Sequence, residues 1–311
     1  MDPIDGVLAV EIESGALDPL GELIVDNLTE AELGDSRALL VEGDRKPGIE
    51  DLVRMKDLGT LIAASRGSWL LETLREERLA VHFQPIVSAD DAGDVFAYEC
   101  LLRGIRTDGA MISPARMFDA ARSTETLFYL DRTARLRAIE EISHLGLDTL
   151  AFINFNPTSI YDPASCLHST LDAVERSNIS AESIVFEVTE SDGIRDMNHL
   201  ERVLSHYRDA GFRVALDDLG SGYGSLNLLT RVRPDFVKLD MELVRDVDAD
   251  PYKATVASSL LQMATDLGVQ VVAEGVETAE QHDWLVAHGA DYLQGYYLAY
   301  PDPTPPVPAC A

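Results

Sequence analysis

Short apolar runs of β-rich composition recur along most of the chain, and stretches with helical periodicity separate most of them. Several of these helical stretches end in glycine just before the next run, as expected at a helix C-cap. The apolar runs cover residues 79–87, 95–103, 150–156, 183–190, 213–218, 235–240, 269–276 and 290–298. Eight strands that largely alternate with helices predict an α/β fold closed into a β/α barrel.

The connection between the first two runs departs from this alternation. Residues 88–94 read SADDAGD, which is too short for a crossover helix. We therefore expect the first two strands to pair as a hairpin, which makes the fold a modified TIM (β/α)8-type barrel with an irregular start. An open, doubly wound sheet is the alternative topology.

The first 50 residues differ from the rest in charge and pattern. They contain 13 acidic and three basic residues, and their helical pieces are short and poorly patterned. Such a segment fits a small helical or partner-binding region, an acidic solvated arm, or the remnant of a larger sensory module. A shift in composition predicts three parts: an acidic, helical N-terminal region with a partner-binding or regulatory role (1–68), the barrel (69–302) and a proline-rich tail (303–311).

The charge of the whole chain restricts its partners. A formal net charge of −29 and a pI near 4.4 argue against binding to nucleic-acid polymers or anionic membranes. The three cysteines lie far apart without zinc-site spacing, which fits a reducing compartment. The N-terminus is acidic where a signal peptide is basic, and no apolar stretch approaches the roughly 18 residues of a membrane span. We expect a soluble, cytoplasmic protein.

Polar side chains stand near the C-terminal end of nearly every apolar run. In a β/α barrel these positions converge on one mouth, where active sites of this architecture lie. They are Gln84, Glu99, Arg103, Asn154, Asn156, Glu187, Glu190, Asp217, Asp218, Lys238, Asp240, Glu274, Glu277 and Gln294. A single such residue is uninformative because strands end in turns, but the repetition indicates a site.

Carboxylates dominate this set, and they indicate metal-ion chemistry. Buried like charges repel one another unless cations hold them together. Oxygen ligands with the amide of Asn154, and without cysteine or histidine, suit Mg²⁺ or Mn²⁺ better than zinc. Two such ions about 3.5–4 Å apart activate water and neutralise a phosphodiester in an in-line displacement. The five carboxylates are Glu99, Glu187, Asp217, Asp218 and Glu274.

Two basic residues fit the same chemistry. Lys238 could orient or deprotonate the attacking water, or balance phosphate charge. Arg103 could hold a phosphate oxygen or a base edge. Several members of the set also fit structural roles. Asp217 and Asp218 precede a glycine turn that polar residues often cap. Asn156 and Asp240 fit either role, and Glu190 and Glu277 fit loop supports.

The run VFAYECLLRG (95–104) has two interpretations. In a helix, Glu99 and Arg103 are four apart and form an ordinary surface pair. In a strand, Glu99, Leu101 and Arg103 share one face, and Cys100 points the other way. The alternation of strands along the chain favours the strand, with Cys100 packed against the surrounding helices.

Eight ordered motifs on the predicted strands resemble the EAL-type cyclic di-GMP phosphodiesterases, over about residues 70–300. They are FQPIV (83–87), YECLLR (98–103), FINFNP (152–157), FEVTE (186–190), ALDDLGSGYGSL (215–226), VKLD (237–240), AEGVE (273–277) and LQGYY (293–297). The resemblance implies a modified barrel that hydrolyses cyclic di-GMP to linear 5′-pGpG with two Mg²⁺ or Mn²⁺ ions and no organic cofactor. It also implies a homodimer formed through the barrel.

The resemblance implies a role for each matched residue. Lys238 would contact the attacking water, and Glu190 would brace the loop after Asp218. The first ion would be held by Glu99, Asn154, Glu187 and Asp217, and the second by Asp217, Asp218 and Glu274. The ligand would be lined by Gln84, Leu101, Arg103 and Gln294, with Asp218 beside it.

The sequence departs from the family pattern in three places. Cys100 replaces the alanine of the motif that names the family, and Leu219 replaces a phenylalanine after the paired aspartates. The loop that follows reads GSGYGSL (220–226) where GTGYSSL is common in the family. Because every expected ligand and the lysine are present, we expect an active enzyme. The main alternative is a weak or inactive cyclic di-GMP receptor or scaffold that signals through its N-terminal region or dimer interface. Such members commonly lack some metal ligands or the lysine, so their presence here favours catalysis. An unrelated metal-dependent barrel of the enolase type would need a different ligand pattern.

Overall fold

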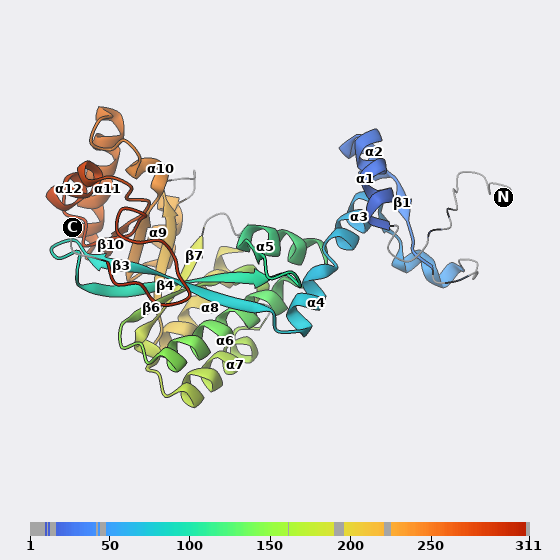
Figure 1. Cartoon of the computed structure of the whole chain (residues 1–311), viewed down its shortest axis with the longest axis horizontal. Coiled ribbons are helices and arrows are strands. Elements are labelled where there is room, and N and C mark those ends of the chain that lie inside the picture. The colour runs from blue at the N-terminus through green and yellow to red at the C-terminus, as the bar shows by residue number, and fades with distance from the viewer. Residues whose placement is uncertain are drawn as a thin grey trace. The chain divides into compact units, whose positions relative to one another are not determined.

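The computed structural model of the chain describes residues 17–41, 48–160, 162–189, 196–220 and 225–308, together with residues 10, 12 and 43. The chain divides into two compact units (Figure 1), residues 1–78 with 115–127 and residues 79–114 with 128–311. None of the helices in the described ranges has the length and hydropathy needed to cross a bilayer.

The first unit is mainly helical, as predicted for the N-terminal region. Side-chain hydrogen bonds at Thr29 determine where α2 begins. The Thr29 side chain accepts from the Glu32 amide, while the Glu32 carboxylate accepts from the Thr29 amide at 2.8 Å. The elements are α1 (Leu17–Asn27), α2 (Glu30–Asp35), α3 (Leu58–Arg66), α4 (Trp69–Arg75), nearly all of α5 (Pro114–Ser123), the 3-10 helix η1 (Ile49–Arg54), and the antiparallel pair β1 (Arg37–Ala38) and β2 (Lys56–Asp57). The predicted boundary at residue 68 stays a prediction.

The second unit alternates strands with helices. Its strands are β3 (Leu79–Ser88), β4 (Val95–Ile105), β5 (Met111–Ile112), β6 (Leu150–Asn154), β7 (Ile184–Thr189), β8 (Arg213–Leu219), β9 (Phe236–Leu239), β10 (Gln270–Ala273) and β11 (Tyr292–Leu293). Its helices are α6 (Leu127–Leu145, from its second residue), α7 (Pro163–Ser177), α8 (Met197–Asp209), α9 (Ser225–Val232), α10 (Met241–Val244), α11 (Pro251–Leu267) and α12 (Ala279–Ala287), with the 3-10 turns η2 (Pro157–Ser159) and η3 (Ala181–Ser183).

The strands close into a barrel, so the predicted fold is confirmed and the open sheet is excluded. The sheet order is β3-β11-β10-β9-β8-β7-β6-β4, and β3 pairs with β4 to complete the ring. The short strand β5 pairs with the end of β4 and is not a member of the ring. Neighbouring strands are parallel from β4 through β6 to β11, whereas β3 is antiparallel to both of its neighbours. The helices lie around the strands (Figure 1).

The predicted hairpin of β3 and β4 determines how far along the barrel axis the first candidate residues lie. Gln84 pairs with Glu99, and Leu79 pairs with Gly104. Because β3 runs against the other strands, Gln84 reaches the level of Glu99 by pairing with it in mid-strand. It does not do so by ending a parallel strand, as the sequence pattern implied.

The last strand is much shorter than the apolar run 290–298 that predicted it. After β11, a Cβ on Gly295 would lie only 2.1 Å from the Val276 carbonyl oxygen, so the two backbones are in direct contact. The Val276 amide donates to the Gln294 carbonyl at 3.0 Å, and the Tyr297 amide donates to the Val276 carbonyl at 2.9 Å. The chain therefore leaves the sheet to bind the loop that follows β10.

Two apolar layers make up the core of the barrel unit. The inner layer fills the barrel with side chains from seven strands: Ile86, Ala97, Phe152, Val185, Ala215, Phe236 and Val272. The outer layer packs between strands and helices and includes Tyr98, Cys100, Ile153 and Phe186. Alternate residues of each strand thus go to opposite layers. Cys100 lies in the outer layer, as its parity in the strand predicted.

Candidate active site

A ring of polar side chains lies next to the inner apolar layer, because strand residues two apart share a face. On six strands an inner-layer residue is followed two positions later by a polar residue, which lies within the strand or, for Glu274, directly after β10. The pairs are Ala97 and Glu99, Phe152 and Asn154, Val185 and Glu187, Ala215 and Asp217, Phe236 and Lys238, Val272 and Glu274. Gln294 follows Tyr292 in the same way, and Gln84 joins the ring through its pairing with Glu99. The structure thus brings together most of the residues selected from the sequence.

Lys238 lies at the centre of this ring and is 1% exposed. Its ammonium nitrogen is within ion-pair distance of four carboxylates. The distances from Nζ are 2.6 Å to Glu274 Oε1, 2.7 Å to Glu187 Oε1, 3.4 Å to Asp217 Oδ1 and 3.6 Å to Glu99 Oε2. Although burial opposes the charged form, these carboxylates raise the pKa of Lys238 well above its ordinary value. Lys238 is therefore held as an ammonium, the one positive charge among these four carboxyl groups.

Glu99 is the best-satisfied carboxylate of the ring. The Gln294 side-chain amide donates to Oε2 at 2.7 Å, and the Asn154 amide donates to Oε1 at 3.2 Å. Burial alone would raise the pKa of Glu99, but Lys238 and the two amides lower it below its ordinary value. Glu99 is thus held as an anion.

If all ionised, the other carboxyl groups would carry more negative charge than Lys238 balances. Burial raises the pKa of Glu187 well above its ordinary value and that of Glu274 to about 8, in both cases against the attraction of Lys238. The pKa of Asp217 is also raised by burial. Glu187 Oε1 lies 2.7 Å from Lys238 Nζ, whereas Oε2 accepts no hydrogen bond from any residue within the described ranges. A buried carboxylate oxygen without a donor, in a cluster of carboxylates with one ammonium, fits a divalent cation with oxygen ligands.

A bulge brings the consecutive aspartates to the same mouth. Between the pairs Leu216–Val237 and Leu219–Leu239, β8 has one residue more than β9, and Asp218 has a left-handed φ of 58°. The Asp218 amide donates to Asp217 Oδ1 at 2.9 Å.

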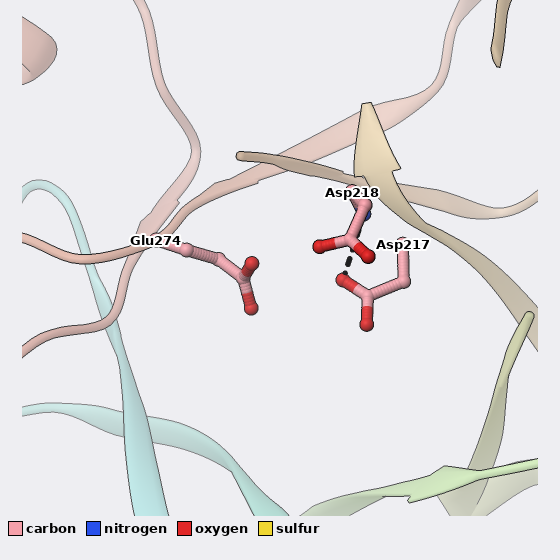
Figure 2. A group of neighbouring side chains, drawn as sticks. All are labelled: Asp217, Asp218 and Glu274. Atoms are coloured by element: carbon pink, nitrogen blue, oxygen red, sulfur yellow. Dashed lines mark hydrogen bonds between the residues drawn. The ribbon is translucent and has the colours of Figure 1, made fainter. Parts of the chain in front are cut away.

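Figure 2 shows Asp217 and Asp218 at the end of β8 facing the Glu274 side chain. One oxygen from each of these three residues lies within 4.8 Å of the other two. Burial and the neighbouring Asp217 and Asp240 raise the pKa of Asp218 to about 6. These three residues form a second group of side-chain oxygens, close enough together to hold a metal ion.

The residues predicted to contact a ligand border this ring. Leu101 and Arg103 continue the face of Glu99 along β4. The Arg103 guanidinium donates to its neighbouring Leu102 carbonyl at 2.8 Å. Gln294 is buried, and its Oε1 has no hydrogen-bond donor among the residues that the structure describes. Glu190 lies outside the described residues.

Asp240 and Asn156, which fitted either a site role or a structural role in the sequence, cap the N-termini of helices. The Asp240 side chain accepts from the Glu242 amide at 2.8 Å and begins α10. The Asn156 side chain accepts from the Thr158 amide at 3.0 Å and begins η2. Sequence reasoning missed Asp131, a buried carboxylate of α6 that contacts the segment after β6. Its four-residue spacing from Arg135 is that of a surface pair, so only an apolar helix face around it could have signalled burial.

Comparison with known proteins gives consistent matches to the barrel. The EAL domain family matches residues 68–301. The cyclic di-GMP phosphodiesterase NbdA of Pseudomonas aeruginosa is 30% identical to this chain in sequence. The matched region covers 75% of this chain and 30% of NbdA. The chain therefore spans about a third of that relative and less than half of others, such as the probable cyclic di-GMP phosphodiesterase PdeB of Escherichia coli at 43%.

Solved structures resemble the same part of the chain. A standalone EAL protein from Vibrio cholerae, solved in its c-di-GMP-bound form, is 35% identical with a TM-score of 0.67, covering 74% of this chain and 95% of that one. BlrP1 of Klebsiella pneumoniae, solved as a manganese and cyclic di-GMP complex, is 33% identical with a TM-score of 0.66, covering 72% of this chain and 56% of that one.

Proposed function

We propose that this chain, which belongs to the EAL domain family, hydrolyses cyclic di-GMP to linear 5′-pGpG in the mouth of its barrel. The observation that carries the proposal is the convergence of four carboxylates on Lys238, beside the group of Asp217, Asp218 and Glu274. A mouth with this excess of negative charge would repel a dianionic substrate unless cations were bound. The proposal is therefore a metal-dependent reaction.

The donor set supports two ions of Mg²⁺ or Mn²⁺. Glu99, Asn154, Glu187 and Asp217 would hold the first, and Asp217, Asp218 and Glu274 would hold the second. When bound, such a pair of ions lowers the pKa of a water molecule and neutralises phosphate charge during an in-line displacement. Manganese together with cyclic di-GMP in the similar structure of BlrP1 supports this choice.

Other side chains of the mouth would orient the attacking water and stabilise the charge that develops in the reaction. The water oxygen attacks phosphorus and the bond to the 3′ oxygen breaks, which leaves a 5′-phosphate and a 3′-hydroxyl. Lys238, which the surrounding carboxylates keep protonated, would donate a hydrogen bond to the attacking water and offset the charge that develops on phosphate. Glu190 would brace the loop after Asp218, in the role that the family resemblance implies.

The ligand contacts follow from the ring. Gln84 and Gln294 present amides beside Glu99, and Gln294 has a free acceptor among the described groups. Arg103 is a planar donor suited to a phosphate oxygen or a guanine edge, and Leu101 between Glu99 and Arg103 offers an apolar wall.

The activity is tested by incubating the protein with cyclic di-GMP and Mn²⁺ and following 5′-pGpG by chromatography. We expect turnover that Lys238→Ala lowers by about 10²- to 10⁴-fold, the range for a positioned proton-transfer or charge-stabilising group. Lys253→Ala is the matched control, because the Lys253 ammonium donates to the Arg245 carbonyl of the neighbouring segment at 2.7 Å and to no carboxylate of the polar ring. Tight binding without turnover in the unaltered protein would instead indicate a receptor or scaffold.

The assembly and the outer segments are part of the same proposal. A homodimer through the barrel is supported by exposed apolar residues on α11, namely Tyr252, Val256 and Leu267. Sedimentation of the protein tests it, and a monomer at micromolar concentration would contradict it. The N-terminal region 1–68 would bind a protein partner or regulate the barrel 69–302, and 303–311 would be a tail.

A further inference from the structure

We propose that Asp131 is a positioning residue for the metal site, and that it fixes Asn154 by holding the backbone of the next segment from the outside of the barrel. The inference rests on the proposed function, because that function makes Asn154 a ligand. Asp131 belongs to α6, outside the strands, and is not part of the polar ring.

The Asp131 carboxylate binds both sides of the turn that follows β6. Its Oδ1 accepts from the Asn156 amide at 2.9 Å, and its Oδ2 accepts from the Ser159 hydroxyl at 3.0 Å. The same hydroxyl contacts the Asn156 carbonyl at 2.8 Å. With Asp131 only 1% exposed, these bonds are made away from water. One carboxylate therefore determines the path of residues 156–159.

Arg135 holds the carboxylate in place. It lies one helical turn beyond Asp131, is fully buried, and hydrogen-bonds to Asp131 Oδ2 through Nη1. Its guanidinium lies 5.2 Å from the centre of the Phe155 ring, as in a cation–π contact. A buried ion pair of this kind contributes little net stability compared with an apolar replacement of similar volume. Its position against the segment after Asn154 therefore indicates a role in placement.

Three consecutive residues are anchored in alternating directions. The Asn154 side chain reaches the mouth, where it donates to Glu99 Oε1 at 3.2 Å. The Phe155 ring packs outward against Tyr207, with ring centres 4.9 Å apart, and its amide donates to the Glu187 carbonyl at 3.0 Å. The Asn156 amide then binds Asp131. Asn154 is the last residue of β6, so the sheet fixes the backbone before it, and the bond from the Asn156 amide to Asp131 fixes the backbone after it.

The alternative is that the pair only stabilises the fold. Isolated ion pairs spaced by four residues stabilise helices by about 0.2–0.5 kcal/mol when exposed. The pair Arg137–Glu141 on the same helix is such a case, with 2.6 Å between Nη2 and Oε1 and both side chains partly exposed. A helix-stabilising role predicts similar effects for both pairs, whereas a positioning role predicts an effect on metal binding for Asp131 alone.

The test uses the full chain and measures Mn²⁺ affinity by calorimetry without substrate. Asp131→Asn can lose stability because Arg135 would be left as a buried, unpaired charge. The informative variant is therefore Asp131→Leu with Arg135→Met, which removes both charges at similar volume. We expect this double variant to remain folded, to lose hydrogen-exchange protection at the Asn156 amide, and to bind Mn²⁺ about 10- to 100-fold more weakly. Glu141→Gln is the matched control and should bind as the unaltered protein does.

A mutant cycle with Asn154→Ala distinguishes failure of the positioning role from failure of the assignment of Asn154 as a metal ligand. If Asp131 acts through Asn154, adding Asn154→Ala to the double variant should weaken Mn²⁺ binding by less than the product of the separate effects. Unchanged Mn²⁺ affinity in the double variant, or effects that simply multiply, would overturn the positioning role while leaving the proposed function intact. If Asn154→Ala alone leaves Mn²⁺ affinity unchanged, the ligand assignment fails, and the inference fails with it.

Discussion

Replacing Lys238 with methionine should destabilise the metal-free protein strongly and in a pH-dependent way. The substitution keeps most of the apolar stem of a fully buried side chain and removes the ammonium that four carboxylates share. Breaking a buried ion pair from one side costs about 3–5 kcal/mol, because the partner stays buried and charged. We expect a loss of this size in the free energy of unfolding at pH 9.

At lower pH the loss should shrink, because the carboxylates can bind protons instead. In the folded protein the pKa of Glu274 is about 8, above its ordinary value of 4.5. A raised carboxyl pKa means that the folded state binds the proton more tightly than the unfolded state does. Glu274 therefore lowers the free energy of unfolding increasingly as pH rises from about 4.5 to about 8. Glu187 and Asp217 shift in the same direction. The difference between variant and unaltered protein should thus be smaller at pH 6 than at pH 9.

The assay is urea unfolding in EDTA at both pH values, repeated with saturating Mn²⁺. Because bound cations replace the missing positive charge, Mn²⁺ should reduce the difference at pH 9. Lys253→Met is the control, with an expected loss of about 1 kcal/mol for the hydrogen bond from its ammonium to the Arg245 carbonyl. Equal stability of Lys238→Met and the unaltered protein at pH 9 without metal would refute the reasoning, since it would mean that the four carboxylates need no counter-charge.

Other substitutions test the register, the ligand contacts and the metal. Cys100→Ala should keep full activity and lose about 1 kcal/mol of stability in urea, because Cys100 lies in the outer layer; lost activity would place its side chain in the mouth. Arg103→Ala should raise KM for cyclic di-GMP more than it lowers kcat, and a pure kcat effect would contradict a ligand contact. Calcium in place of Mn²⁺ should preserve binding of cyclic di-GMP by calorimetry but stop release of pGpG, since its looser coordination positions water poorly. Gly295→Ala should lower the melting temperature sharply, because its Cβ would overlap the Val276 backbone, whereas the control Gly34→Ala meets no atom within 4 Å and should leave it unchanged or higher.

The barrel and its polar ring were predictable because both follow from a period of two along each strand. In Phe236–Val237–Lys238, for example, the first and third residues face the interior and the second faces the helices. This parity placed Glu99 and Cys100 on opposite faces without knowledge of any contact. Local sequence therefore carried most of the information about which side chains share the mouth.

The features that were not predictable depend on contacts between distant segments. The early end of β11 follows from the approach of Gly295 to Val276, which the apolar run 290–298 does not reveal. The bulge that turns Asp218 toward Asp217 follows from the pairing of β8 with β9. The burial of Asp131 depends on where α6 packs, since the spacing in sequence is the same for buried and exposed pairs.

The reversed first strand also changes where the chain enters the barrel. Leu79 pairs with Gly104, beyond Glu99 on the mouth side of β4, so β3 begins near the rim and runs down to the floor. In a barrel of eight parallel strands the first strand would instead begin at the floor. The chain therefore enters the barrel at the rim that carries Arg103, which pairs directly with Ala80, the second residue of β3.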